Sequence, residues 1–213
     1  MWLIISYLLL PTALQYGNAL LPTSLSDSKL NFIYYCINFI VVFWIFRQFL
    51  KDSFREALRR PFAVLWYAAL GYLGCQALSE ILMTLVYMIL PIFSNVNDQS
   101  IGSMLQSDFR LMAIGTVFLV PVAEEALYRG VLFRGFYEKS PIVAYLASMV
   151  LFAAIHVVGY IGYFQPLHLL LCFVQYLPAG FCLCWCYRQT GTIITPMLMH
   201  TIVNAMSVSE YVR

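Results

Sequence analysis

Long apolar stretches alternate with short polar ones along the whole chain. Each of the long stretches has about 17 residues or more, which is enough for a helix to cross the hydrocarbon core of a bilayer. They cover residues 2–21, 30–50, 62–93, 111–133, 142–163, 167–187 and 192–208. The pattern therefore predicts an all-α fold, a polytopic transmembrane helical bundle of about seven spans.

A polar segment divides this pattern into two regions. The stretch SNVNDQSIGSMLQSD, residues 94–108, is the clearest expected loop. We expect residues 1–110 to hold N-terminal transmembrane helices and this loop, and residues 111–213 to hold a catalytic helical core, both within one compact membrane domain. No basic residue precedes the first apolar stretch and no convincing cleavage site follows it, so we interpret it as a retained span.

Composition supports a membrane environment. The 213 residues are 62% hydrophobic and only 10% charged, against about 25% charged residues in a soluble domain. A net charge of +2 without a dense basic patch argues against binding to nucleic acid. The expected surroundings are a lipid bilayer.

Basic residues predict how the chain is oriented in that bilayer. Five of them lie between the second and third apolar stretches, and cytoplasmic loops are enriched in Lys and Arg. Threading from there also puts three later basic residues inside, and it gives a cytoplasmic N-terminus and an external C-terminus. The residues on the inner side are Arg47, Lys51, Arg55, Arg59, Arg60, Arg134, Lys139 and Arg188.

The six cysteines do not suggest a disulfide framework, because they lie inside apolar stretches. Cys182, Cys184 and Cys186 have a spacing that resembles a metal site, but side chains two residues apart do not share one helix face. Packing in the core is therefore favoured over ligation of a metal.

The stretch PVAEEALYRG places three ionisable residues inside an apolar span. Glu125 and Arg129 are spaced i,i+4 in the order that favours an ion pair. Glu124 points about 100° away and has no local cation, at a cost on the order of 3 kcal/mol by insertion scales. A structural ion pair explains Glu125 and Arg129 but leaves Glu124 unexplained, which favours a functional role for Glu124.

Two histidines also lie within apolar spans, and each belongs to an i,i+4 pair. His156 follows Phe152, and His200 precedes Asn204. Pro196 lies a turn before His200 and Pro121 stands similarly before Glu124; a proline inside a helix frees a carbonyl and bends the helix. A water held between a carboxylate and imidazoles, beside an amide donor, is what peptide hydrolysis requires.

Three patterns together resemble the signature motifs of a known family. Glu124-Glu125-x-x-x-Arg129, Phe152-x-x-x-His156 and His200-x-x-x-Asn204 are similar to those of the CAAX protease and bacteriocin-processing (CPBP, or Abi) intramembrane endopeptidases, which include the type II prenyl-protein endopeptidases. The resemblance covers residues 111–208.

The resemblance implies roles for these residues. Glu124 would activate the attacking water, and His156 would orient that water or shuttle its proton. His200 and Asn204 would stabilise the oxyanion, and Glu125 and Arg129 would hold their helix in place. A glutamic-type, metal-free mechanism without cofactors is favoured over a zinc site, because no H-E-x-x-H pattern is present.

The expected substrate is a membrane protein or a membrane-associated peptide. Small size and the breadth of the family suggest a prokaryotic protein in the bacterial inner membrane. Two alternatives stay open: a non-catalytic membrane scaffold or immunity-type protein, and a small transporter or proton relay, since intramembrane acids and histidines also mark such paths.

Overall fold

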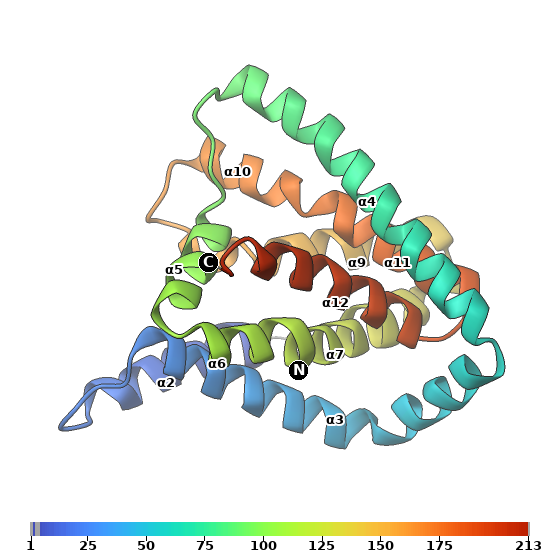
Figure 1. The fold of residues 1–213 in the computed structure, drawn as a ribbon, viewed down its shortest axis with the longest axis horizontal. Helices are drawn as coiled ribbons and strands as arrows, with labels where there is room; N and C mark the ends of the chain where they lie inside the picture. The colour runs from blue at the N-terminus through green and yellow to red at the C-terminus, as the bar shows by residue number, and fades with distance from the viewer. Residues whose placement is uncertain (1, 3–4, 213) are drawn as a thin grey trace.

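Helices make up every regular element in the part of the chain that the structure describes. A computed structural model describes residue 2 and residues 5–212, and its helices pack into one bundle (Figure 1). The predicted all-α class is therefore confirmed. In chain order the elements are η1 (Ile5–Leu9), α2 (Leu10–Ala19), α3 (Asp27–Arg59), α4 (Pro61–Ile89), α5 (Val96–Ser107), α6 (Phe109–Ile114), η2 (Gly115–Leu119), α7 (Val120–Glu125), η3 (Ala126–Phe133), α8 (Arg134–Tyr137), α9 (Pro141–Ile155), η4 (Val158–Tyr160), α10 (Pro166–Gln175), α11 (Leu177–Thr190) and α12 (Ile194–Ser209).

Within the described residues, four helices are long and apolar enough to cross a membrane. They are Asp27–Arg59, Pro61–Ile89, Phe109–Tyr137 and Pro166–Thr190, of 25 to 33 residues each. The predicted count of about seven spans is not confirmed, because the other three apolar stretches form shorter helices. The longest of these, α12, has 16 residues, against the roughly 20 that a full crossing needs.

Two of the expected boundaries were wrong. The segment expected to be a polar loop forms α5, because the Asn95 side chain accepts hydrogen bonds from the backbone N–H groups of Asn97 and Asp98 and so starts a helix. The expected span 142–163 ends at Ile155, and a short turn follows in which Gly162 has a φ of 91°. A residue with a side chain rarely adopts that conformation.

The helix Phe109–Tyr137 lies at the centre of the bundle. In its most apolar stretch of 18 residues, 56% of the residues are buried, whereas the corresponding share in α3 is 11%. Two π-helical segments, η2 and η3, interrupt its α-helical register on either side of α7. Helices α3 and α12 pack beside α7, and α9 packs beside η3 (Figure 1).

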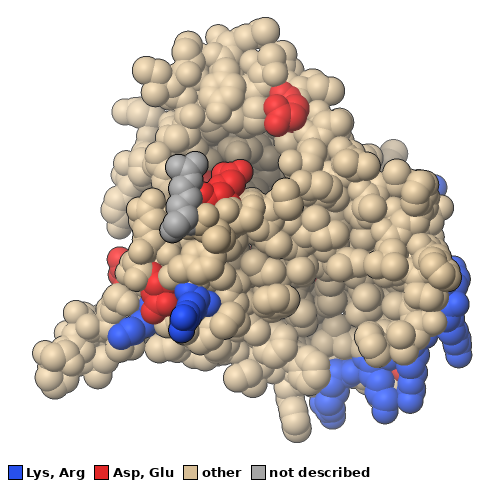
Figure 2. Space-filling view, in the orientation of Figure 1, with Lys and Arg blue, Asp and Glu red and all other residues tan. Residues whose placement is uncertain are grey.

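The bundle has one strongly basic end. Figure 2 shows Lys and Arg side chains gathered at the end where α3 passes into α4. Arg134 lies over the ring of Phe49, and Arg60 donates a hydrogen bond to the carbonyl of Thr190. The basic residues that the sequence assigned to one side of the membrane therefore do lie together.

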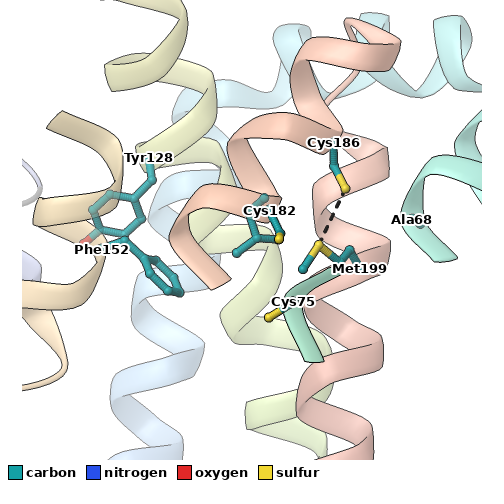
Figure 3. Packing of buried hydrophobic residues seen from close by; sticks show 8 residues of the cluster. Ala68, Cys75, Tyr128, Phe152, Cys182, Cys186 and Met199 are labelled. Carbon is teal, nitrogen blue, oxygen red and sulfur yellow. Dashed lines mark hydrogen bonds between the residues drawn. The ribbon is translucent and has the colours of Figure 1, made fainter. Parts of the chain in front are cut away.

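The cysteines pack in the core, as predicted. Cys182, Cys184 and Cys186 are buried on α11, and each is a free thiol. Cys75, Cys182 and Cys186 share a cluster with Met199, where the Sγ of Cys186 lies 3.6 Å from the Sδ of Met199 (Figure 3). The cluster joins α4 to α11 and α12, so helices from both predicted regions share one core. The division of the chain near residue 110 stays a prediction.

Two glycines of α4 test how close this packing is. A Cβ added at Gly71 would lie 2.2 Å from the Cys186 Sγ and 3.0 Å from the Met199 Sδ. We expect Gly71→Ala to destabilise the protein by about 1–3 kcal/mol, because α4 must move away from α11 and α12. Thermal unfolding in detergent measures the effect.

Gly74→Ala is the matched control on the same helix. Its added Cβ would lie 3.8 Å from the Cys182 Sγ, an ordinary contact. Alanine favours a helix over glycine by about 1 kcal/mol, so Gly74→Ala leaves the melting temperature unchanged or raises it. Equal effects of the two substitutions would contradict close packing at Gly71.

Candidate active site

Two adjacent glutamates end α7, in the middle of the central helix. Both are buried, with 7% of Glu124 and none of Glu125 exposed. Successive residues of a helix point about 100° apart, so the two carboxylates meet different neighbours. Glu125 faces other helices of the bundle, whereas Glu124 faces a cavity.

Glu125 is held by a cation and an imidazole. Its Oε1 accepts a hydrogen bond from Arg129 Nη1 at 3.0 Å and lies 2.9 Å from His200 Nδ1. Arg129 also donates from Nη2 to the carbonyl of Gly180 at 3.1 Å. These bonds tie the central helix to both α12 and α11. The ion pair was predicted from its spacing, but its contact with His200 was not.

The contact with Glu125 fixes the state of the His200 ring. Oε1 of Glu125 already accepts a hydrogen bond from Arg129, and we assign it as the acceptor toward His200 as well. The hydrogen of this bond must then be on Nδ1 of His200. The neutral ring consequently has its lone pair on Nε2, which the bond to Glu125 leaves available.

His156 is oriented in a comparable way at the end of α9. Its Nδ1 lies 2.7 Å from the carbonyl oxygen of Phe152, one turn earlier, and a carbonyl can only accept. Nε2 again keeps the lone pair. The ring stacks on Tyr176, with centroids 4.1 Å apart and an interplanar angle of 25°. The structure thus places His156 at a helix end, whereas the sequence placed it within a span.

Phe152 lies between the charged and the neutral parts of the site. Its ring centroid is 4.9 Å from that of His156 and 5.8 Å from that of His200, and the Arg129 guanidinium carbon lies 4.7 Å from its centre. The ring therefore spaces the two histidines and also shields the ion pair on one side. This gives a physical reason for phenylalanine in the Phe152-x-x-x-His156 pattern.

Asn204 binds a carbonyl that a proline leaves free. In η2 the N–H of Val120 bonds to the carbonyl of Gly115, five residues back. Continuing this π register would pair residue 121 with the carbonyl of Thr116, but Pro121 has no N–H. Asn204 Nδ2 donates to that carbonyl at 2.8 Å instead. The amide keeps its second hydrogen and its oxygen for other partners.

The carbonyl expected to be freed at Pro121 is thus present, at the end of a π segment. The same expectation fails for Pro196. Pro196 lies in the first turn of α12. Backbone N–H groups there have no partner inside the helix in any case. The prediction that Pro196 frees a carbonyl before His200 was therefore wrong.

Glu124 forms no ion pair with any of the described residues. Its Oε1 accepts a hydrogen bond from the Tyr7 hydroxyl at 3.3 Å, and its buried Oε2 has no hydrogen-bond partner among the described residues. Because Glu124 lines a cavity, this oxygen can accept a hydrogen bond from a water or a substrate that enters there. Glu124 is the carboxylate that a structural ion pair could not explain in the sequence analysis.

All four predicted catalytic residues line one cavity of about 840 Å³, within the size range of ligand-binding sites. They are Glu124, His156, His200 and Asn204. Glu125 and Arg129 do not line this cavity, and their supporting role stays a prediction. The structure brings the residues together, and their catalytic roles stay predictions.

Two tyrosines of this site were missed. Tyr7 reaches Glu124 from η1, and Tyr176 stacks on His156 from the junction of α10 and α11. The Tyr176 hydroxyl donates to Asp98 Oδ1 at 2.7 Å and so anchors the ring to α5. No sequence signal separates them from the other 13 tyrosines of the chain, because their partners are distant in sequence.

The cavity could hold a water between a carboxylate and two imidazole lone pairs. A carboxylate without a cation can accept a proton from such a water, and the amide of Asn204 can donate to an oxygen beside it. In residue 2 and residues 5–212, no group of three His, Cys, Asp or Glu side chains is arranged to hold a metal ion. The arrangement suits acid–base hydrolysis of a polar bond.

Comparison with known proteins points to a family of membrane peptidases. Residues 106–206 match the family model "Type II CAAX prenyl endopeptidase Rce1-like". The chain is also 28% identical over 173 residues to a protein of Bacillus subtilis (strain 168) named "Putative membrane peptidase YdiL", an alignment that covers 79% of this chain and 66% of that relative. No solved structure matches the chain. The resemblance predicted from the three motifs is thereby confirmed.

Proposed function

We propose that this chain, whose second half belongs to the CAAX protease-like family of membrane proteins, is an endopeptidase that hydrolyses a peptide bond in or near the membrane. Its substrate would be a membrane protein or a membrane-associated peptide. The family match and the relative support a membrane peptidase. The residue roles that follow are our proposal.

Glu124 would start the reaction as general base. A water in the cavity gives a proton to the free Oε2 while its oxygen attacks the carbonyl carbon of the substrate. The Nε2 lone pair of His156 accepts the second water hydrogen in a hydrogen bond and so aims the oxygen. The product of this step is a tetrahedral intermediate that carries a negative oxygen.

His200 and Asn204 would stabilise that oxygen. The second amide hydrogen of Asn204 can donate to it directly. His200 can donate to it from Nε2 in the imidazolium form, which takes its second proton from solvent before the reaction and keeps that proton throughout, while Nδ1 stays bound to Glu125. Collapse of the intermediate breaks the C–N bond, and the proton held by Glu124 passes to the leaving amine. Glu124 is then ionised again.

One difference between the two glutamates supports this division above the others. Glu125 is paired with Arg129 at 3.0 Å and does not line the cavity, whereas Glu124 lines the cavity and forms no ion pair among the described residues. A paired carboxylate is a poor base because its charge is already stabilised. We therefore assign proton abstraction to Glu124 and support of His200 to Glu125.

Glu124→Gln is expected to abolish cleavage and leave the protein folded, because the amide keeps the size and the hydrogen bond of the side chain but cannot accept the proton. Mass spectrometry of membrane-protein termini compares cells that express the unchanged protein with cells that express the variant. Termini that depend on Glu124 also identify the substrate.

Glu80→Gln is the control for that experiment. Glu80 is another acid on a membrane-spanning helix, but it is exposed and does not line the cavity. Its variant should give the same termini as the unchanged protein. An identical set of termini from Glu124→Gln would refute the proposed function and leave a scaffold or transporter to explain the polar residues.

We propose that the reaction needs no metal, since water activation is assigned to a carboxylate base. Cleavage of a substrate identified above should continue in the presence of a strong zinc chelator. A metal-dependent hydrolase would lose activity because a bound metal ion generates the nucleophile. Loss of cleavage that added zinc restores would overturn the metal-free mechanism.

Tyr176 would act as a positioning residue through its stack on His156. Tyr176→Ala should lower kcat by about tenfold or more, a part of the factor of about 10²–10⁴ that a positioned acid–base group supplies. KM should change little, because the ring holds the imidazole and not the substrate.

Tyr176→Phe separates the stack from the hydroxyl. It keeps the ring against His156 and loses only the hydrogen bonds to α5. We expect kcat to recover most of its value in this variant. Equal losses in Tyr176→Ala and Tyr176→Phe would show that the ring does not position His156.

A further inference from the structure

The cavity lies toward one end of the bundle. Its lining includes Asp27 at the first turn of α3, Ser103 of α5, Gly159 after α9 and Glu210 after α12. Figure 2 shows the surface hollowed on the side of α4 and α12, near the end where α5 lies. The mouth is therefore formed at one end of the bundle, where the start of α3 lies beside the ends of α9 and α12.

The basic residues lie at the opposite ends of those helices. Asp27 and Arg59 are the first and last residues of α3, which at 1.5 Å per residue is about 48 Å long measured along the helix. Outside the buried Arg129, eight of the described Lys and Arg residues belong to the far end and two, Lys29 and Arg110, to the end of the mouth. The eight are Arg47, Lys51, Arg55, Arg59, Arg60, Arg134, Lys139 and Arg188.

Such an asymmetry has a physical meaning in a membrane. Positively charged segments stay on the cytoplasmic side, and a bias of eight to two decides the orientation of a small bundle. The described helices alternate in direction consistently with it: α3 runs toward the basic end, α4 away from it and Phe109–Tyr137 toward it again (Figure 1).

We propose that the cavity opens on the extracytoplasmic side of the membrane. Resting on the proposed function, this assigns the substrate to a class: a segment at the outer membrane surface, and not a cytoplasmic C-terminal tail. Glu124 lies 15 residues from the start of its helix at Phe109, about 22 Å deep. At about 3.3 Å per residue, an extended substrate needs about seven residues to reach it.

Two glycines offer a matched test of this orientation. Gly135 and Gly159 lie before and after α9, so they flank opposite ends of one helix. Both are exposed, and a Cβ added at either position meets nothing within 4 Å. Gly135→Cys and Gly159→Cys therefore place a thiol in open space at the basic end and at the cavity mouth.

The full chain carrying either substitution is expressed in bacteria and treated, in right-side-out spheroplasts, with a membrane-impermeant maleimide. The unchanged chain gives the background from its native cysteines, five of which are buried. We expect Gly159→Cys to be labelled in intact spheroplasts, and Gly135→Cys to lose its labelling unless the membrane is permeabilised. Ser103→Cys, exposed on α5, should repeat the result for Gly159.

Any other pattern overturns the orientation, including labelling of both mouth positions only after permeabilisation. The test is independent of catalysis, because labelling needs no turnover and can be repeated in the Glu124→Gln background. Expected labelling with unchanged termini in Glu124→Gln would refute the peptidase and keep the orientation. Reversed labelling with lost cleavage would keep the peptidase and move its substrate to the cytoplasm.

Discussion

The buried ion pair between Glu125 and Arg129 is the constraint on which the site depends. Two charges buried in an apolar bundle are tolerated where they pair with each other and with further polar groups. Here the pairing reaches His200 on α12 and the carbonyl of Gly180 on α11. The interaction that makes the charges tolerable therefore also joins three helices and sets the proton on one imidazole. Loss of either charge would disturb the position of His200 as well as the stability of the fold.

The backbone register of the central helix positions another residue of the site, Asn204. Pro121 cannot donate to Thr116 in a π register, and the resulting free carbonyl holds Asn204. A second π segment starts directly after Glu125. Such segments are frequent at functional sites because they rotate the side chains that follow them. The region that carries Glu124 and Glu125 is thus built by local departures from the α-helix, and α12 binds to it through His200 and Asn204.

The sequence predicted which polar residues lie together better than it predicted where the helices end. Glu124, His156, His200 and Asn204, which line one cavity, were singled out because polar groups in apolar spans are costly and therefore conspicuous. Tyr7 and Tyr176 were missed because tyrosines are common at membrane interfaces and their partners lie far away in sequence. Helix ends were missed for a local reason: hydropathy does not register the cap at Asn95 or the turn at Gly162.

The short helices and the site have a common explanation. Hydrolysis inside a bilayer requires water at mid-depth, and a complete set of full-length spans would pack that space with apolar side chains. Helix α9 has only 15 residues and ends one residue before His156, about 22 Å from its start. After α9 the chain changes direction and forms the short helix η4. The imidazole of His156 is therefore at the wall of the cavity. The expected seventh span is also short, and the tail that follows it supplies Glu210 and Tyr211 to the same cavity. The departure from seven long spans therefore leaves open the cavity in which we propose that a water and a substrate meet Glu124.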